Sequence, residues 1–252
     1  MSLTNKTVVV TGGTRGLGLG VVEALVEAGA KVRVVARDAG GLDAVRSRLG
    51  VEAVAANITD AAAARRILAE TRPDILILNA GATPPMAPID QVSWADFSAT
   101  WETDVKGGLY WLQAALNMPL APGSRVLVSS SGAGQQGSPL SGGYGGAKRM
   151  LWFMAKYAGG VSEQKGLGIR FQAIVPMQMI GGTGVGGAGS AAYAKAAGVE
   201  PEAFLARLGA PMPPRQYGEH IVRVLSDHQY DTALALGFRG DTGITMLEGQ
   251  AA

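Results

Sequence analysis

Short runs of apolar, mostly β-branched residues alternate along this chain with longer stretches in which apolar residues recur at helical spacing. The runs predict buried strands over residues 7–10, 31–36, 51–56, 74–79, 125–130 and 168–175, and a short strand near 232–236. The intervening stretches predict helices over residues 17–30, 60–70, 96–116, 144–161 and near 218–226. Strands that are apolar throughout are typical of parallel sheets covered by helices on both faces. The pattern therefore predicts an α/β fold with a doubly wound parallel sheet.

No linker, low-complexity segment or fixed repeat divides the 252 residues, so we expect one domain over residues 1–252. Apolar residues make up 47% of the chain, which excludes a disordered protein. The formal net charge of +2 gives no basic surface for nucleic acid. The absence of cysteine excludes disulfides, thiolate metal sites and a Cys nucleophile. With only His220 and His228 as histidines, we expect no metal site.

The longest uncharged stretch, residues 171–194, contains Pro176 and six glycines between Gly181 and Gly189. This composition makes a poor membrane-spanning helix. Residues 1–6 lack the basic start and apolar core of a secretory signal. We therefore expect a protein of the cytoplasm, with no membrane as a partner.

A glycine-rich segment, TGGTRGLG, directly follows the first predicted strand and precedes the first predicted helix. Gly12, Gly16 and Gly18 would let the backbone turn tightly and approach a pyrophosphate, toward which the helix N-terminus directs its amides and dipole. The alternative is a tight turn that binds no ligand. We expect cofactor contacts at six positions of this segment: Gly12, Thr14, Arg15, Gly16, Leu17 and Gly18.

The end of the second predicted strand indicates which dinucleotide would bind. An acidic residue there would accept hydrogen bonds from the ribose hydroxyls of NAD and would repel a 2′-phosphate. This chain has Ala36 followed by Arg37, and Arg15 could reach the same phosphate. Guanidinium groups bind phosphate through a planar fork of donors, so NADP(H) is favoured over NAD(H). Two alternatives remain: Asp38 is a displaced acidic residue, or Arg37 is a plain surface charge.

Tyr144 and Lys148 lie four residues apart in YGGAK, so they share one face of a predicted helix. Ser131 follows the fifth predicted strand, and ligands of parallel sheets bind at the carboxyl ends of the strands. An ammonium beside a phenol favours the ionised phenol, so this tyrosine could exchange a proton with a substrate oxygen. The serine could hydrogen-bond the developing oxyanion. The alternatives are an ordinary helix pair and a serine that bonds its own backbone.

Together with NAG at residues 79–81, these motifs resemble those of the classical short-chain dehydrogenase/reductase family over residues 7 to about 242. The resemblance implies a Rossmann-like fold, hydride transfer at nicotinamide C4 and, often, a homotetramer. It implies that Tyr144 is the acid and base, that Ser131 orients the carbonyl and that Lys148 binds the nicotinamide ribose. It also implies cofactor contacts at Asn57, Ile58, Asn79, Ala80, Gly81, Tyr144, Lys148, Pro176 and Met179.

Asp104 departs from the family's pattern, which usually has Asn at this position. In the family, the main-chain carbonyl of that residue helps to hold a water of a proton relay. The resemblance therefore makes Asp104 a candidate catalytic residue. Its carboxylate could also alter the pKa of Lys148.

Three further positions depart from the family's pattern on the cofactor side. Met177 follows Pro176 where the family usually has Gly, and the Thr expected soon afterwards is absent at Gly181, with Thr183 as its alternative. Asn57 replaces the usual Asp. Its amide oxygen could still accept a hydrogen bond from the adenine amino group.

The glycine run over residues 181–189 predicts a flexible loop, and we expect a substrate lid over about 180–215. The alternative is a second phosphate loop, although the run lacks the Lys-Ser/Thr ending of such loops. An adaptable apolar pocket is predicted from Met86, Leu140, Met177 and Met179. The alternative is that these methionines only fill gaps in the core.

Residues 150–155 are apolar at six consecutive positions of a predicted helix. A sheet covers only one side of a helix, so we expect the rest of this surface to contact another subunit in a homodimer or homotetramer.

The function predicted from the sequence is an NADP(H)-dependent oxidoreductase that interconverts a ketone or aldehyde and an alcohol. The expected substrate is a small, fairly apolar carbonyl compound or alcohol. One alternative is a non-catalytic NADP(H)-binding sensor or scaffold on the same fold. The other is epimerisation or dehydration on this scaffold.

Overall fold

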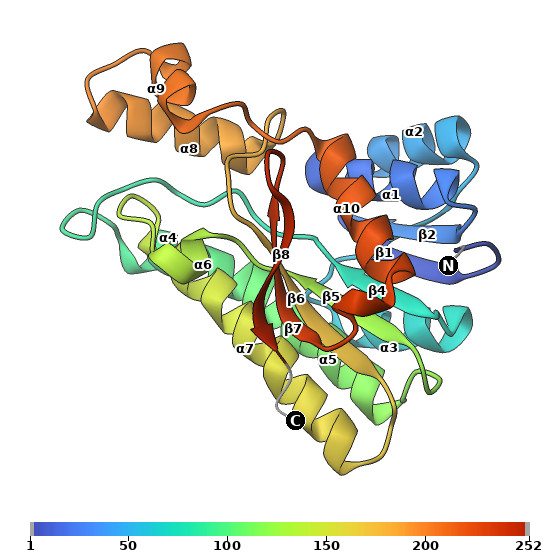
Figure 1. Cartoon of the computed structure of the whole chain (residues 1–252). Coiled ribbons are helices and arrows are strands. Elements are labelled where there is room, and N and C mark those ends of the chain that lie inside the picture. Colours follow the sequence, from blue (N-terminus) through green and yellow to red (C-terminus); the bar gives the residue numbers. More distant parts are fainter. Residues whose placement is uncertain (1–2, 250–252) are drawn as a thin grey trace.

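The computed structural model describes residues 3–249, so the first two and last three residues of the predicted domain 1–252 lie outside it. The strands of the described chain form one eight-stranded sheet in the order β3-β2-β1-β4-β5-β6-β7-β8. Neighbouring strands are parallel except β7 and β8, which are antiparallel. Helices cover both faces of the sheet (Figure 1). The predicted doubly wound α/β fold is confirmed.

The strands are β1 (Thr7–Thr11), β2 (Lys31–Ala36), β3 (Glu52–Ala55), β4 (Ile75–Leu78), β5 (Arg125–Ser129), β6 (Arg170–Pro176), β7 (Ala233–Arg239) and β8 (Gly243–Gly249). The α-helices are α1 (Gly16–Glu27), α2 (Ala39–Leu49), α3 (Ala61–Thr71), α4 (Trp94–Thr100), α5 (Lys106–Asn117), α6 (Ala133–Gln136), α7 (Gly142–Gln164), α8 (Gly184–Ala196), α9 (Pro201–Leu208) and α10 (Pro214–Ser226). A π-helical turn, η1 (Trp101–Val105), joins α4 to α5, and a 3₁₀ turn, η2 (His228–Tyr230), follows α10.

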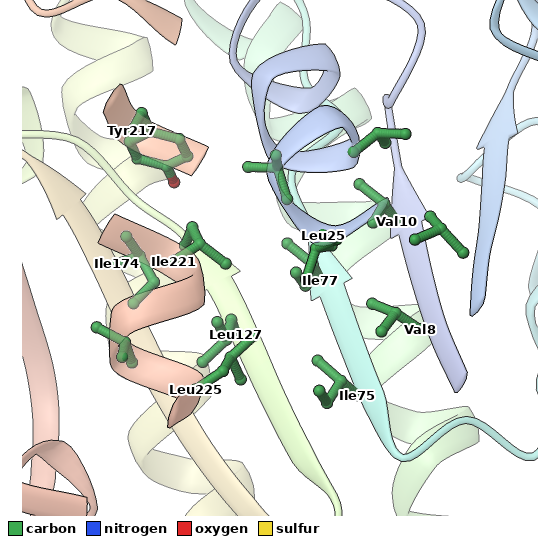
Figure 2. Packing of buried hydrophobic residues seen from close by; sticks show 14 of the residues in the cluster. Val8, Val10, Leu25, Ile75, Ile77, Leu127, Ile174, Tyr217, Ile221 and Leu225 are labelled. Atoms are coloured by element: carbon green, nitrogen blue, oxygen red, sulfur yellow. The ribbon is translucent and has the colours of Figure 1, made fainter. Parts of the chain in front are cut away.

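Alternate residues of the central strands contribute to two different hydrophobic cores. In β1, Val8 and Val10 join the core under α1 and α10, whereas Val9 joins the core under α3, α5 and α7. Figure 2 shows part of the first core, to which α1 contributes Leu25 and α10 contributes Ile221. Because both faces of the sheet are buried, the strands are apolar at nearly every position, as the sequence pattern predicts.

Helices α1 and α10 approach each other closely because a glycine stands on each at the contact. A Cβ added to Gly218 would lie 2.1 Å from the carbonyl oxygen of Gly20. A Cβ added to Gly20 would lie 2.1 Å from the carbonyl oxygen of Pro214. Any larger residue at either position would push the two helices apart.

Several elements differ from the sequence predictions. The predicted helix 96–116 is interrupted by the π-helical turn η1, which separates α4 from α5. Helix α2 was not predicted, because Leu42 and Val45 alone are buried and the apolar signal is weak. Strand β8 was not predicted either, since it lies at the sheet edge and none of its residues is fully buried. Within residues 3–249, no helix has the length and apolar character needed to cross a membrane.

Candidate active site

The carboxyl ends of the parallel strands open into a cavity of about 920 Å³. The structure brings every predicted site residue to the wall of this cavity. These residues are Gly12, Thr14, Arg15, Gly16, Leu17, Gly18, Arg37, Asn57, Ile58, Asn79, Ala80, Gly81, Asp104, Ser131, Tyr144, Lys148, Pro176 and Met179. They come from widely separated parts of the sequence and meet because parallel strands end at the same edge of a sheet.

The segment between β1 and α1 turns tightly, and two of its glycines have a backbone conformation that other residues rarely adopt. The angle φ is +72° at Gly12 and +55° at Gly16. An added Cβ at Gly18 would lie 2.1 Å from the carbonyl oxygen of Gly12, so no side chain fits there. Helix α1 begins at Gly16, which places its unpaired N-terminal amides at the cavity wall. This backbone fits the pyrophosphate of a dinucleotide.

The NAG segment after β4 holds this turn in place. Thr11 Oγ1 accepts hydrogen bonds from the backbone N–H groups of Asn79 (3.0 Å) and Ala80 (3.2 Å). The Asn79 amide donates to the carbonyl oxygens of Thr11 and Gly12, both at 3.4 Å. The ends of β1 and β4 are therefore cross-linked directly beside the cavity.

Two arginines lie at the end of the cavity next to β2. Arg15 and Arg37 are exposed, and neither forms an ion pair within residues 3–249. Asp38 accepts a hydrogen bond from the backbone N–H of Gly41 (2.8 Å) and caps the start of α2. One carboxylate oxygen is thus engaged by the helix, while both guanidinium groups are free to meet a phosphate.

Asn57 follows β3 at the same end of the cavity. Its side-chain oxygen accepts a hydrogen bond from the backbone N–H of Thr59 at 3.1 Å. An amide oxygen has a second lone pair, so this bond leaves one acceptor site for a ligand. Ile58 lies next to it, with its side chain against Gly107 at the start of α5.

Tyr144 and Lys148 lie on the first turns of α7, and both line the cavity. Lys148 Nζ is 5.6 Å from the centre of the Tyr144 ring. Only 8% of the lysine side chain is exposed, and its ammonium donates a long hydrogen bond (3.4 Å) to the carbonyl oxygen of Ser129. A buried cation at this position can stabilise negative charge on the phenol oxygen.

The serines after β5 tie that strand to the neighbouring helix. Ser130 Oγ donates to the carbonyl oxygen of Lys148 at 2.7 Å. Ser131 Oγ accepts a hydrogen bond from the backbone N–H of Ala133 at 3.2 Å and also lines the cavity. Ser131 therefore makes a hydrogen bond to the nearby backbone, which was the alternative to a role in binding the substrate oxygen. Its hydroxyl hydrogen still has no partner within the described chain.

Asp104 in the π-helical turn contacts Lys148 directly. Its Oδ2 lies 3.0 Å from Lys148 Nζ, and its side chain is completely buried. Its Oδ1 accepts a hydrogen bond from the backbone N–H of Ala82 at 2.8 Å. Burial lowers the pKa of Lys148, but the Asp104 carboxylate, together with the phenols of Tyr144 and Tyr217, outweighs this effect and holds the pKa above its ordinary value.

A family model described as short chain dehydrogenase matches residues 6–185 of this chain. The chain belongs to the short chain dehydrogenase family. Oxidoreductase asL5 of Sarocladium schorii is 30% identical to this short chain dehydrogenase over 183 residues, which are 69% of this chain and 72% of asL5. The crystal structure of an NAD+-bound xylitol dehydrogenase has the same fold, with a TM-score of 0.80, 20% identity and coverage of 93% of this chain and 97% of that one.

Other relatives match a smaller part of the short chain dehydrogenase. Short chain dehydrogenase/reductase AacuD of Aspergillus aculeatus is 34% identical over 154 residues, which are 58% of this chain and 54% of AacuD. The sorbitol dehydrogenase of Cereibacter sphaeroides is 30% identical over 168 residues, which are 63% of this chain and 65% of that enzyme. The chain thus spans between half and two thirds of these two proteins.

The glycine run of this short chain dehydrogenase is mostly helical, contrary to the predicted flexible loop. Thr183 caps α8 by accepting a hydrogen bond from the backbone N–H of Gly186 at 3.0 Å. Its methyl carbon also lies 3.3 Å from the position that a Cβ would take on Gly16. Thr183 therefore reaches the phosphate-binding turn. Threonine is a common N-cap residue, so Thr183 within the run was the sequence signal from which a helix could have been predicted here.

Tyr193 on α8 is a cavity residue that the sequence analysis missed. Its hydroxyl lies 2.7 Å from Ser138 Oγ and accepts a long hydrogen bond (3.3 Å) from the backbone N–H of Leu140. Its ring stacks on Phe204 of α9 with 6.1 Å between centroids. Tyr193 thereby links α8 and α9 to the segment that leads into α7. No local motif marks this residue, because its partners are distant in the sequence.

The predicted apolar pocket is present in part. Met86, Met177 and Met179 line the cavity, whereas Leu140 does not. Met177 also packs against the core cluster under α7, so both predicted roles apply to it.

Most of the apolar surface of residues 150–155 is covered within the chain itself. Leu151, Trp152, Met154 and Ala155 are buried, and the indole N–H of Trp152 donates to Glu248 of β8 at 2.9 Å. The unpredicted strand β8 thus covers a side of α7 that the sequence analysis assigned to a second subunit. The oligomeric state stays a prediction.

Proposed function

We propose that this short chain dehydrogenase interconverts an uncharged ketone or aldehyde and the corresponding alcohol, with NADP(H) as its preferred cofactor. The observation that carries the proposal is the buried Lys148 ammonium beside the Tyr144 ring, at the far end of a cavity that begins at a phosphate-binding turn. Relatives named sorbitol dehydrogenase and galactitol 2-dehydrogenase support an alcohol and carbonyl pair as substrates.

The proposed chemistry assigns one task to each side chain at the cavity. When bound, the dinucleotide supplies or accepts a hydride at its nicotinamide. The Tyr144 hydroxyl gives its proton to the carbonyl oxygen as that oxygen gains the charge of an alkoxide, so that C=O becomes CH–OH. Ser131 donates a hydrogen bond to the same oxygen. The Lys148 ammonium stabilises the charge left on the phenol oxygen and presents donors to ribose hydroxyls.

The preference for NADP(H) rests on the charges next to β2. Arg15 and Arg37 offer two guanidinium groups without ion-pair partners in the described chain, and the nearest carboxylate, Asp38, caps α2. A 2′-phosphate would gain two charge-assisted contacts there. NAD(H) would leave both guanidinium groups without an anion, so we expect it to bind more weakly.

The charge distribution of the cavity supports an uncharged, fairly apolar substrate. Its charged lining residues are Arg15, Arg37, Asp38, Asp104 and Lys148. The first three lie at the nucleotide end, and the last two form an ion pair with each other. The remaining wall presents Met86, Met177 and Met179 together with neutral polar groups. A carboxylate or phosphate on the substrate would find no free cation beside Tyr144.

Tyr144→Phe tests the assignment. We expect kcat for carbonyl reduction to fall at least about 100-fold, because general acid catalysis by this hydroxyl is lost. NADPH binding, measured by nucleotide fluorescence, should stay within about twofold, since the ring remains in place. The matched control is Tyr157→Phe, an exposed tyrosine on the same helix. Near-normal reduction by Tyr144→Phe would contradict the proposal.

A panel of carbonyl compounds and alcohols, with NADPH and NADH in parallel, identifies the substrate class. Tight NADPH binding without turnover of any neutral carbonyl or alcohol would instead favour the non-catalytic sensor or scaffold. Turnover without net oxidation or reduction would favour epimerisation or dehydration. The cytoplasmic location and the homo-oligomer stay predictions from the sequence, and analytical ultracentrifugation tests the second.

A further inference from the structure

The buried pair between Asp104 and Lys148 places a negative charge beside the ammonium that lies next to the proposed proton donor. Asp104 Oδ2 and Lys148 Nζ are 3.0 Å apart, and the aspartate side chain has no exposed surface. We propose that Asp104 is a positioning residue, which acts as the counter-ion of Lys148 and keeps the proton on Tyr144, so that the site favours carbonyl reduction over alcohol oxidation. The choice of direction rests on the function proposed above, whereas the electrostatic claim does not.

The surroundings of Asp104 hold its carboxylate in one place. Oδ1 is fixed by the backbone N–H of Ala82, which follows the NAG segment. Gly81 packs against the carboxylate so tightly that an added Cβ would lie 2.7 Å from Oδ2. The remaining oxygen therefore faces the ammonium as an ion-pair partner, and the ammonium donates a hydrogen bond to the carbonyl of Ser129. The two side chains are thus held by backbone groups of Ala82, which follows β4, and of Ser129, which ends β5.

Three other titratable groups influence the Lys148 ammonium at this point. Asp104 comes from the π-helical turn, Lys148 and Tyr144 from α7, and Tyr217 from α10 across the sheet. Burial raises the pKa of Tyr217 to about 12, so this phenol stays neutral. Its hydroxyl lies 3.4 Å from Ser129 Oγ.

The balance of charge then decides how easily Tyr144 loses its proton. With Asp104 and Lys148 both charged, the pair is neutral, and ionisation of the half-buried Tyr144 adds a net negative charge next to a buried ion pair. With a neutral residue in place of Asp104, the same ionisation would neutralise the ammonium instead. Carbonyl reduction requires the protonated phenol, and alcohol oxidation requires the phenolate. Asp104 therefore favours the proton-donating form.

Asp104→Asn tests this inference, because it removes the charge and keeps the shape and the acceptor for Ala82. The readout is the ultraviolet absorbance of tyrosinate during a pH titration, with the signal of Tyr144 isolated by subtracting Tyr144→Phe made in each background. We expect the midpoint of Tyr144 ionisation to fall by about one pH unit in Asp104→Asn. In turnover, the pH profile of alcohol oxidation should shift by the same amount.

Asp74→Asn is the matched control. Asp74 forms an ion pair with Lys6, also at 3.0 Å, and this pair lies at the opposite end of β4. Its removal should leave the midpoint of Tyr144 unchanged. An unchanged or higher midpoint in Asp104→Asn would overturn the inference and would leave Asp104 as a backbone anchor only. The titration needs no cofactor and no substrate, so it stands even if the proposed activity fails.

A second measurement covers the case in which Asp104→Asn does not fold. Removing one partner leaves the other as an uncompensated buried charge, whereas removing both does not. We therefore expect Asp104→Asn and Lys148→Met each to lower Tm by more than the double variant does. Additive losses in Tm would mean that the two groups do not act as a pair, and the inference would fail.

Discussion

At the scale of single residues, the proposed preference for NADP(H) depends on two arginines and one aspartate. Arg15 and Arg37 lie at its end next to β2, and Asp38 is held by the backbone N–H of Gly41. The family pattern and the residue order were sufficient to predict the two arginines as candidates. The hydrogen bond of Asp38 was not predictable, because α2 itself was not predicted.

Arg37→Ala should weaken NADPH about 10- to 100-fold and NADH less than about threefold, because a charge-assisted hydrogen bond to the 2′-phosphate is lost only for NADPH. Fluorescence titration of both nucleotides measures the difference. Arg65→Ala is the control, since Arg65 is an exposed arginine of α3 that does not line the cavity. Equal losses for the two nucleotides would place the 2′-phosphate elsewhere.

The site residues differ in how far sequence alone could predict them. Tyr144 and Lys148 stand at a fixed helical spacing, so their proximity follows from local structure. The contact of Lys148 with Asp104 depends on how η1 packs against α7, and no local pattern contains that information. Sequence therefore predicted which residues line the site, and the structure was needed to find the ion pair.

At the scale of elements, α8 departs most clearly from the prediction. Its glycines have low helix propensity, which favours a flexible loop over residues 181–189. The cap from Thr183 and the attachment of Tyr193 to Ser138 hold it as a helix instead. The local cap and the tertiary contact together outweigh propensity here, and only the tertiary contact was invisible in the sequence. Strand β8 was missed for the related reason that its only pairing partner is β7.

Tyr193→Phe should raise KM for the carbonyl substrate about five- to tenfold, because α8 and α9 lose the hydroxyl bonds that hold them over the cavity. The value of kcat and the affinity for NADPH should change less than about twofold. Steady-state kinetics with each variant measure the split. Tyr157→Phe serves as control again, and unchanged KM in Tyr193→Phe would contradict a role in closing the cavity.

Across the whole molecule, α1 from the first part of the chain packs against α10 from its last part. The strand order and the presence of both helices follow from the alternation of apolar runs and helical stretches. Their close approach does not, because it depends on Gly20 and Gly218 meeting across almost the full length of the sequence. From sequence alone, a glycine within a helix is expected only to destabilise that helix. Its role in close packing becomes evident when the partner helix is known.

Gly218→Ala should lower the free energy of unfolding by about 2–4 kcal/mol, because the new methyl group would overlap the carbonyl oxygen of Gly20. Urea denaturation measures this loss. Gly159→Ala is the matched control on α7, where an added Cβ has no neighbour within 4 Å. We expect that control to gain up to about 1 kcal/mol from helix propensity. Equal effects of the two changes would mean that α1 and α10 can separate freely.

Helix α8 reaches both ends of the cavity, through Thr183 beside Gly16 and through Tyr193 beside Ser138. A nucleotide that enters after this helix has settled over a substrate would have to pass beneath it. For the proposed reaction we therefore expect an ordered sequence, in which the dinucleotide binds before the substrate and leaves after the product.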